Sequence, residues 1–153
     1  MRKVTLISLL LFASTCFAES AQLETLKRGC NSGVAIACTA VGVEYVVKKN
    51  YFEAIEYLKQ GCDGNNADGC TMLGASYAEG LGVRQDHFKA VEYYKKGCGG
   101  NSAGGCYNLG IAYARGQGVR LNDGQALHYS GLACDLKHQL GCENYAILKK
   151  RRR

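Results

Sequence analysis

The chain has 153 residues, about the length of one domain, and contains 20 glycines, no proline and no tryptophan. Its glycines are spread along the sequence, which argues against a low-complexity linker. The formal net charge is +6, and five positive charges stand in the C-terminal run KKRRR, residues 149–153. Because the rest of the chain is nearly neutral, we expect no nucleic-acid binding by the folded body.

Residues 1–18 have the features of a secretory signal peptide. A basic start, MRK, precedes the apolar run VTLISLLLFAST, and the small residue Ala18 precedes the expected cleavage point. The apolar run is too short to span a membrane comfortably, so no transmembrane segment is expected after cleavage. The alternative is a lipoprotein attached through Cys16, although Ala13 and Thr15 are poor neighbours for a lipidated cysteine. We therefore expect a periplasmic or secreted protein.

Eight cysteines follow the expected signal peptide, and they form four consecutive pairs. Within each pair the separation is eight positions: Cys30 and Cys38, Cys62 and Cys70, Cys98 and Cys106, Cys134 and Cys142. The pairs begin 32, 36 and 36 residues apart, and such a period is typical of a solenoid of small repeated units. An even number of cysteines in an exported chain indicates a disulfide framework.

Each repeat contains two segments with helical spacing of apolar residues. The segment after the second cysteine of a pair reads CTAVGVEYV (38–46), CTMLGASYA (70–78) and CYNLGIAYA (106–114). The segment before the first cysteine reads NYFEAIEYLKQGC (50–62), DHFKAVEYYKKGC (86–98) and NDGQALHYSGLAC (122–134). We expect residues 20–30 to form a lone helix of the second kind and residues 141–150 a lone helix of the first. The sequence thus predicts roughly eight helices, stacked as antiparallel pairs.

Caps and glycines set the limits of these helices. Asn50, Asp86 and either Asn122 or Asp123 are suitable N-caps for the second helix of each repeat. The glycine-broken segments 79–85 and 115–121 are expected loops, and the first repeat has a loop four residues shorter. A repeated glycine inside the first helix, Gly74 and Gly110, costs about 1 kcal/mol relative to alanine. That cost predicts a close crossing with a neighbouring helix.

The spacing within a cysteine pair predicts a chain reversal. On one continuous helix, Cys98 and Cys106 would lie about 12 Å apart. A disulfide needs Cα atoms about 5.5–6 Å apart, so the pair could bond only across a hairpin. Eight cysteines allow 105 pairings, and four local pairs are the only pairing that treats every repeat alike. Zinc sites favour two to four residues between ligands, so no metal site and no cofactor are expected.

The segment from Leu73 to Gly97 reads LGxxYxxGxGVxxDxxKAxxYYxKG and resembles the Sel1-like repeat, a relative of the tetratricopeptide repeat. The added cysteine pair is similar to that of the Helicobacter cysteine-rich proteins. The resemblance covers residues 22–148, although the first repeat lacks GxGV. It implies an all-α, right-handed solenoid of antiparallel αα-hairpins with one disulfide per repeat, and export. It also implies either β-lactam binding with slow hydrolysis, as in a β-lactamase, or protein binding on a concave face.

No catalytic constellation is apparent in the sequence. A serine β-lactamase needs a lysine three residues after its nucleophile, and none of the seven serines has one. Three histidines show no metal spacing and are expected to be solvated at the surface: His87, His128 and His138. The carboxylates form no recognisable acid–base couple. Catalytic residues therefore stay unassigned, and enzymatic activity rests on the resemblance alone.

Positions that vary between repeats are the best candidates for a binding face, because a solenoid specialises its concave surface while its framework stays fixed. The candidates lie in two neighbouring first helices: Thr71, Met72, Ala75, Ser76, Tyr107, Asn108, Ile111 and Ala112. The recurring tyrosines are expected to pack: Tyr45, Tyr77 and Tyr113, with Tyr57, Tyr93 and Tyr129.

These observations predict a signal peptide at 1–18, a repeat domain at 19–148 and a basic tail at 149–153. The tail would be a solvated end or would contact an anionic surface such as phospholipid or an acidic partner. The predicted function is that of an exported scaffold for a protein or peptide. The alternative is a penicillin-binding protein with slow β-lactam hydrolysis, whose ligand would be a β-lactam or a peptidoglycan-like molecule.

Overall fold

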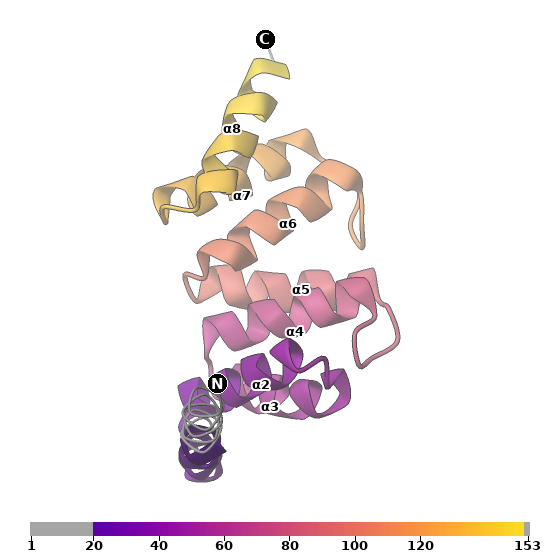
Figure 1. The fold of residues 1–153 in the computed structure, drawn as a ribbon. Helices are drawn as coiled ribbons and strands as arrows, with labels where there is room; N and C mark the ends of the chain where they lie inside the picture. Colours follow the sequence, from indigo (N-terminus) through magenta and orange to yellow (C-terminus); the bar gives the residue numbers. More distant parts are fainter. Residues whose placement is uncertain (1–19, 152–153) are drawn as a thin grey trace, which may run out of the picture.

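The computed structural model describes residues 20–151, which fold into helices without a strand. The expected signal peptide and the last two residues lie outside this range. A helix at residues 20–31 comes first, and seven more follow: α2 (Ala35–Val47), α3 (Tyr51–Asp63), α4 (Ala67–Glu79), α5 (His87–Gly99), α6 (Ala103–Arg115), α7 (Asp123–Asp135) and α8 (Gln139–Arg151). Figure 1 shows these helices stacked in chain order from α2 to α8. The expected all-α solenoid is confirmed.

Two kinds of helix alternate along the stack. We call α2, α4, α6 and α8 the A helices, and the helix at 20–31, α3, α5 and α7 the B helices. Each A helix packs against the neighbouring B helices, and consecutive A helices also contact each other. No comparable contact joins α3 to α5 or α5 to α7. The A helices therefore lie on the inner side of the stack and the B helices on the outer side.

Two of the predicted caps bond to the backbone at the start of a B helix, whereas Asn50 precedes α3 without a side-chain cap hydrogen bond. The Asp86 carboxylate accepts hydrogen bonds from the backbone N–H groups of Phe88 and Lys89, both at 3.0 Å. Asn122, rather than Asp123, caps α7 by accepting from the N–H of Gln125 at 3.0 Å. Each cap satisfies an N–H that has no partner inside the helix.

All four disulfides join the two cysteines of a local pair: Cys30–Cys38, Cys62–Cys70, Cys98–Cys106 and Cys134–Cys142. Their Cα atoms are 4.4–4.5 Å apart, within the range that a disulfide spans without moving the backbone. Each bond links the end of a B helix to the start of the next A helix. The predicted reversal is confirmed. Figure 1 shows the short turns between B helices and the next A helices at one edge of the stack, opposite the longer loops after α4 and α6.

The glycines inside the A helices lie at close crossings, as predicted. A Cβ at Gly74 would lie 2.8 Å from the ring of Tyr94 on α5, and one at Gly110 would lie 2.8 Å from Ser130 Oγ on α7. The recurring tyrosines join A and B helices within a repeat: ring centroids are 5.5 Å apart for Tyr45–Tyr57, 5.5 Å for Tyr77–Tyr93 and 5.6 Å for Tyr113–Tyr129. These stacked pairs contribute to the packing of each hairpin.

The C-terminal basic run begins inside a helix. Helix α8 continues to Arg151, so Lys149, Lys150 and Arg151 form its last turn rather than a separate tail. Basic side chains are favourable there, because the C-terminal end of a helix carries partial negative charge.

Candidate binding face

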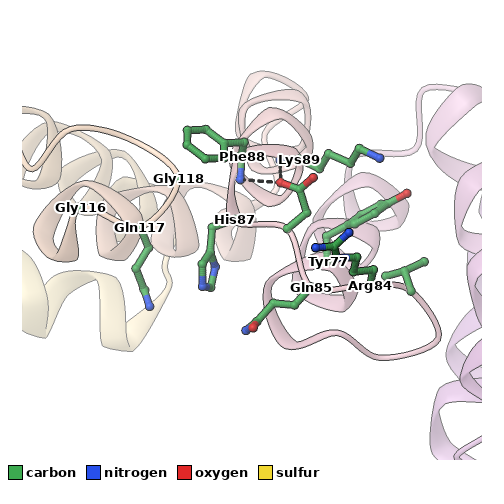
Figure 2. Close-up of a pocket in the computed structure, with 11 residues that line it drawn as sticks. Tyr77, Arg84, Gln85, His87, Phe88, Lys89, Gly116, Gln117 and Gly118 are labelled. Carbon is green, nitrogen blue, oxygen red and sulfur yellow. Dashed lines mark hydrogen bonds between the residues drawn. The ribbon is translucent and has the colours of Figure 1, made fainter.

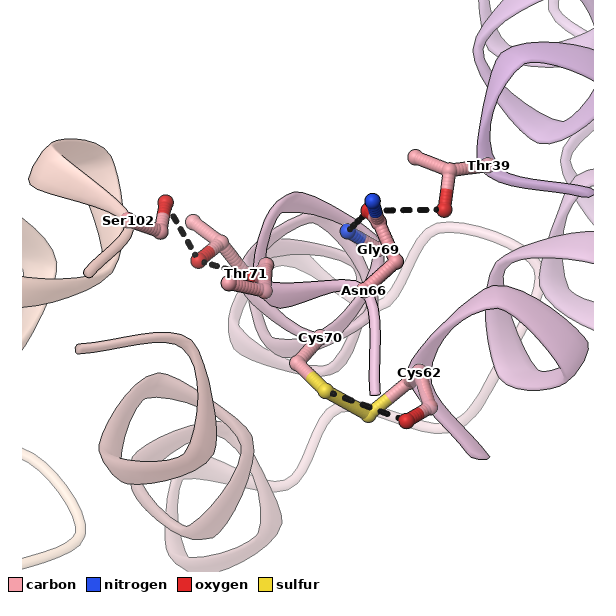
Figure 3. Close-up of a disulfide and its surroundings, with 8 residues drawn as sticks. Thr39, Cys62, Asn66, Gly69, Cys70, Thr71 and Ser102 are labelled. Atoms are coloured by element: carbon pink, nitrogen blue, oxygen red, sulfur yellow. Dashed lines mark hydrogen bonds between the residues drawn. A yellow bond between two sulfur atoms is a disulfide. The ribbon is translucent and has the colours of Figure 1, made fainter. Parts of the chain in front are cut away.

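Polar contacts between repeats occupy the start of α4 and of α6. Asn66, at the start of α4, accepts hydrogen bonds from Thr39 Oγ1 at 3.0 Å and from the N–H of Gly69 at 2.8 Å. Figure 3 shows this asparagine beside the Cys62–Cys70 disulfide, in the turn between α3 and α4. The side chain thus caps its own helix and also holds the preceding A helix.

Four of the predicted binding residues pack within the protein. Thr71 is buried, and its hydroxyl donates to Ser102 Oγ at 3.0 Å (Figure 3). Ser76 is buried and donates to the carbonyl of Met72 at 3.0 Å, and Ala112 is buried. Tyr107 stacks on His138 in the next turn, with ring centroids 4.7 Å apart. Thr71 and Tyr107 contact the turns that follow, and Ser76 bonds to its own helix, so these three offer little surface to a partner. Ala112 also forms part of the wall of a hollow between α4, α5 and α6.

The stacking on Tyr107 also corrects the expectation for one histidine. His138 is half-buried, and its Nδ1 accepts a hydrogen bond from the N–H of Gly141 at 3.2 Å. It therefore caps α8 instead of lying solvated at the surface. His128 is exposed as expected, and its ring lies edge-on to Tyr129. His87 is half-buried at the start of α5.

The other four predicted residues divide into two pairs. Asn108 and Ile111 line a hollow where α6 faces α4 and α5, whereas Met72 and Ala75 pack against hydrophobic clusters of the core. Met72 and Ala75 of α4, and Asn108 and Ile111 of α6, are all half-buried. One helical turn further along, the same face carries Glu79 on α4 and Arg115 on α6. We call four of the residues that line this hollow the inner groove: Glu79, Asn108, Ile111 and Arg115.

The inner groove contains a hollow of about 250 Å³ between α4, α5 and α6. Its walls include Glu79, Asn108 and Arg115, and Tyr94 of α5. Sequence reasoning missed Glu79, Arg115 and Tyr94. The first two could have been found from helical spacing, because they follow Ala75 and Ile111 by four positions on the same helix face.

The Tyr94 phenol is held in its protonated form. Burial, and to a smaller extent the Glu79 carboxylate, raise the pKa of Tyr94 to about 12. Within residues 20–151, no group makes a hydrogen bond with this hydroxyl. At neutral pH it is therefore a hydrogen-bond donor available at the wall of the hollow.

A second, larger hollow of about 980 Å³ opens at the loop edge. Figure 2 shows it between the loop before α5, the start of α5 and the loop that follows α6. Lys89 Nζ lies 5.2 Å from the centroid of the Tyr77 ring, a cation–π contact. His87 and Gln117 line both hollows, so the two are adjacent.

The described residues offer little for other classes of site. No group of three or more His, Cys, Asp or Glu side chains in residues 20–151 could hold a metal ion. Three serines in this part of the chain, Ser76, Ser102 and Ser130, are buried. None of the helices between residues 20 and 151 has the length and apolar character needed to cross a membrane.

Comparison with solved structures shows the same fold in three bacterial proteins. A Helicobacter pylori cysteine rich protein B is 31% identical, with a TM-score of 0.66 over 79% of this chain and 95% of that one. A Sel1 repeat protein from Oxalobacter formigenes is 23% identical, with a TM-score of 0.73 over 82% and 97% of the two chains. The uropathogenic Escherichia coli protective antigen c5321, which displays an SLR fold, is 22% identical with a TM-score of 0.80. That match covers 84% of this chain but only 28% of the antigen.

Sequence comparisons complete the assignment. A search of curated proteins found no match. The family model of the Sel1 repeat matches three consecutive segments, residues 35–66, 67–102 and 103–138. Each segment contains one A helix, the following B helix and the turn that leads to the next repeat. The chain therefore belongs to the Sel1 repeat family.

Proposed function

We propose that the protein is an exported scaffold that binds a segment of a partner protein, or a peptide, along the inner face of its A helices. The observation that carries this proposal is the inner groove. The polar side chains of Asn108 and Arg115 line its hollow, yet they make no hydrogen bond or ion pair with any group in residues 20–151. Sel1 repeat proteins generally mediate protein–protein interactions, which supports the same function.

Apolar side chains at the N-terminal end of the inner face support the proposal. Ile36 and Val47 of α2 are 68% and 73% exposed. Counted from the nearest cysteine, they occupy the same helix positions as Asp68 and Glu79 of α4. Exposed apolar side chains next to a polar groove are typical of surfaces that a protein partner covers.

The disulfides would lower the cost of binding. Each one fixes the end of a B helix against the next A helix, so the inner face is ordered before a partner arrives. A preorganised surface loses less conformational entropy on association. The disulfides also suggest an oxidising environment outside the cytosol.

The proposal includes cleavage after Ala18, which would leave residues 19–148 as the repeat domain and 149–153 as its basic end. The four disulfides support export, because disulfides persist in oxidising compartments. No observation on the described residues favours β-lactam hydrolysis.

The test begins with selection of random dodecapeptides against the purified, oxidised protein. A benzophenone amino acid is then placed at the exposed Glu79 in the inner groove or, as a control, at the exposed Glu56 of α3. We expect selected peptides to crosslink from position 79 and not from position 56. Failure to select any peptide, or crosslinking from position 56 alone, would overturn the proposal. Turnover of nitrocefin, or labelling by a fluorescent penicillin, would instead favour the β-lactam alternative.

A further inference from the structure

Helices α6 and α8 carry the same three side chains at the same three inner positions. Two, five and nine residues after the second cysteine of the pair, α6 has Asn108, Ile111 and Arg115. At the same intervals after Cys142, α8 has Asn144, Ile147 and Arg151. We call these the Asn–Ile–Arg triplets. The other two A helices differ, with Ala40, Val43 and Val47 on α2 and Met72, Ala75 and Glu79 on α4.

Helix geometry places each triplet on one face. At 3.6 residues per turn, positions two, five and nine fall within an arc of about 60°. On α6 that face is the inner one, because Asn108, Ile111 and Arg115 all line the hollow of the inner groove. Helices α6 and α8 contact each other, and packed helix axes lie about 8–10 Å apart. The two triplets therefore follow the same order along neighbouring helices, with the asparagines nearer the Tyr107–His138 stack and the arginines at the far ends of α6 and α8.

The polar members of the triplets are available to a ligand. Within residues 20–151, no hydrogen bond or ion pair engages the side chains of Asn108, Asn144, Arg115 or Arg151. An asparagine amide both donates and accepts, which matches the N–H and C=O of an extended backbone. An arginine guanidinium binds a carboxylate through two parallel hydrogen bonds. The isoleucine between them offers an apolar contact.

The charge of the inner face changes along the stack, and this change determines how a charged ligand is oriented. Arg115 and Arg151 end the two triplets, so the C-terminal end of the face is basic on α6 and α8. Lys149 and Lys150 share the last turn of α8 with Arg151 but lie at least about 100° around the helix from it. Glu79 occupies the arginine position on α4, and α2 has the apolar Val47 there. A carboxylate on the ligand would be attracted to α6 and α8 and repelled at α4.

We propose that the Asn–Ile–Arg triplets bind an extended acidic peptide segment, whose carboxylates pair with Arg115 and Arg151. The inference rests on the proposed function and specifies its partner. An extended chain advances about 3.3 Å per residue, so helices about 8–10 Å apart select carboxylates two to four residues apart. The two asparagines hold the backbone of this segment, and its apolar continuation lies over α4 and α2.

The first test compares two labelled decapeptides that differ only in charge, one with two glutamates three residues apart and one with glutamines there. Fluorescence anisotropy measures their binding to the mature, oxidised protein. We expect the glutamate peptide to bind at least about tenfold more tightly. The double substitution R115Q/R151Q should remove this difference, whereas the matched control K149Q/K150Q should keep most of it. Equal binding of the two peptides, or a difference that survives in R115Q/R151Q, would overturn the proposal.

A second variant tests the asparagines. N108A/N144A should weaken both peptides by a similar factor, because backbone contacts do not depend on ligand charge. A loss of affinity confined to the glutamate peptide would contradict the role of the asparagines in holding the peptide backbone. All of the substituted side chains are exposed or half-buried, and circular dichroism of each oxidised variant checks that the fold is retained.

Peptide selection separates failure of this inference from failure of the proposed function. Selected peptides that crosslink from position 79 but show no enrichment in Asp or Glu would refute the acidic partner and leave the scaffold function standing. If no peptide is selected, both proposals fail. Binding to phosphatidylglycerol vesicles without any peptide binding, abolished by R115Q/R151Q, would assign the arginines to a membrane surface instead and overturn the inference.

Discussion

The backbone of Gly118 lies directly against the carbonyl group of His87, in the preceding repeat. The same contact joins Gly82 to Tyr51 one repeat earlier. In both places the loop after an A helix packs on the first residue of the previous B helix. The second glycine of the GxGV segment therefore has a structural role that periodicity alone did not reveal, namely to join consecutive repeats along the loop edge.

Substitution of Gly118 by alanine should destabilise the protein by about 2–4 kcal/mol. A Cβ would overlap with the His87 carbonyl, and the residue has φ of 68°, where side chains are strained. Urea unfolding followed by circular dichroism measures the change. The matched control is Gly33→Ala, since Gly33 has φ of 85° but no atom within 4 Å of an added Cβ. Equal losses in the two variants would show that backbone strain, and not the contact between repeats, accounts for the effect.

Removal of one disulfide by paired alanine substitutions should cost slightly under about 3 kcal/mol, because each closes a loop of the same short length. We expect similar losses for Cys30–Cys38 and Cys98–Cys106, whose sequence separation is 8 in both cases. Urea unfolding of each double variant gives the free energies. A loss for the central pair several times larger than for the terminal pair would show that the bond supports packing between repeats, beyond its effect on the unfolded chain.

Ser102 combines two roles in one hydroxyl. It accepts from the N–H of Gly105 at 3.3 Å as the cap of α6, and it donates to Asp68 on α4 at 2.7 Å. Ser102→Ala should therefore cost about 1–2 kcal/mol for the cap and a further ~1 kcal/mol for the link between repeats. The control Asn122→Ala removes a cap that serves its own helix alone. Thermal unfolding of both variants should show the larger decrease in Tm for Ser102→Ala. Equal decreases in Tm would show that the hydrogen bond from Ser102 to Asp68 does not contribute to stability.

The framework of this protein follows from local rules, whereas the binding face depends on how repeats meet. Cysteine spacing, caps and the glycine crossing at Gly74 each involve a hairpin and its immediate neighbours, so periodicity was sufficient to predict them. Variation between repeats did not identify which side chains are exposed to a partner. Thr71 and Tyr107 occupy equivalent positions and differ because the next turn offers Ser102 to one and His138 to the other. A side chain that varies to fit its neighbour looks the same in sequence as one that varies to fit a ligand.

Tyr94 should make stability depend on alkaline pH. Its folded pKa is raised to about 12, from an ordinary value of 10.0, chiefly by burial and secondarily by Glu79. The folded state thus holds the phenolic proton more tightly than the unfolded state does. The resulting stabilisation is complete below pH 10 and is lost as the pH rises from about 10 to about 12. Phenylalanine at this position has no proton to lose, so Tyr94→Phe should remove this part of the decline.

Two measurements check the titration of Tyr94. Absorbance of tyrosinate near 295 nm, compared between the native protein and Tyr94→Phe, should assign one transition near pH 12 to this residue. Urea unfolding between about pH 9 and pH 11.5 should then show a smaller decline for Tyr94→Phe than for the native protein. Lysines titrate in the same range in both proteins, so the difference between the two curves isolates the tyrosine. Parallel curves would mean that the Tyr94 phenol has the same pKa in the folded and unfolded states, and that its burial against α4 does not penalise the tyrosinate form.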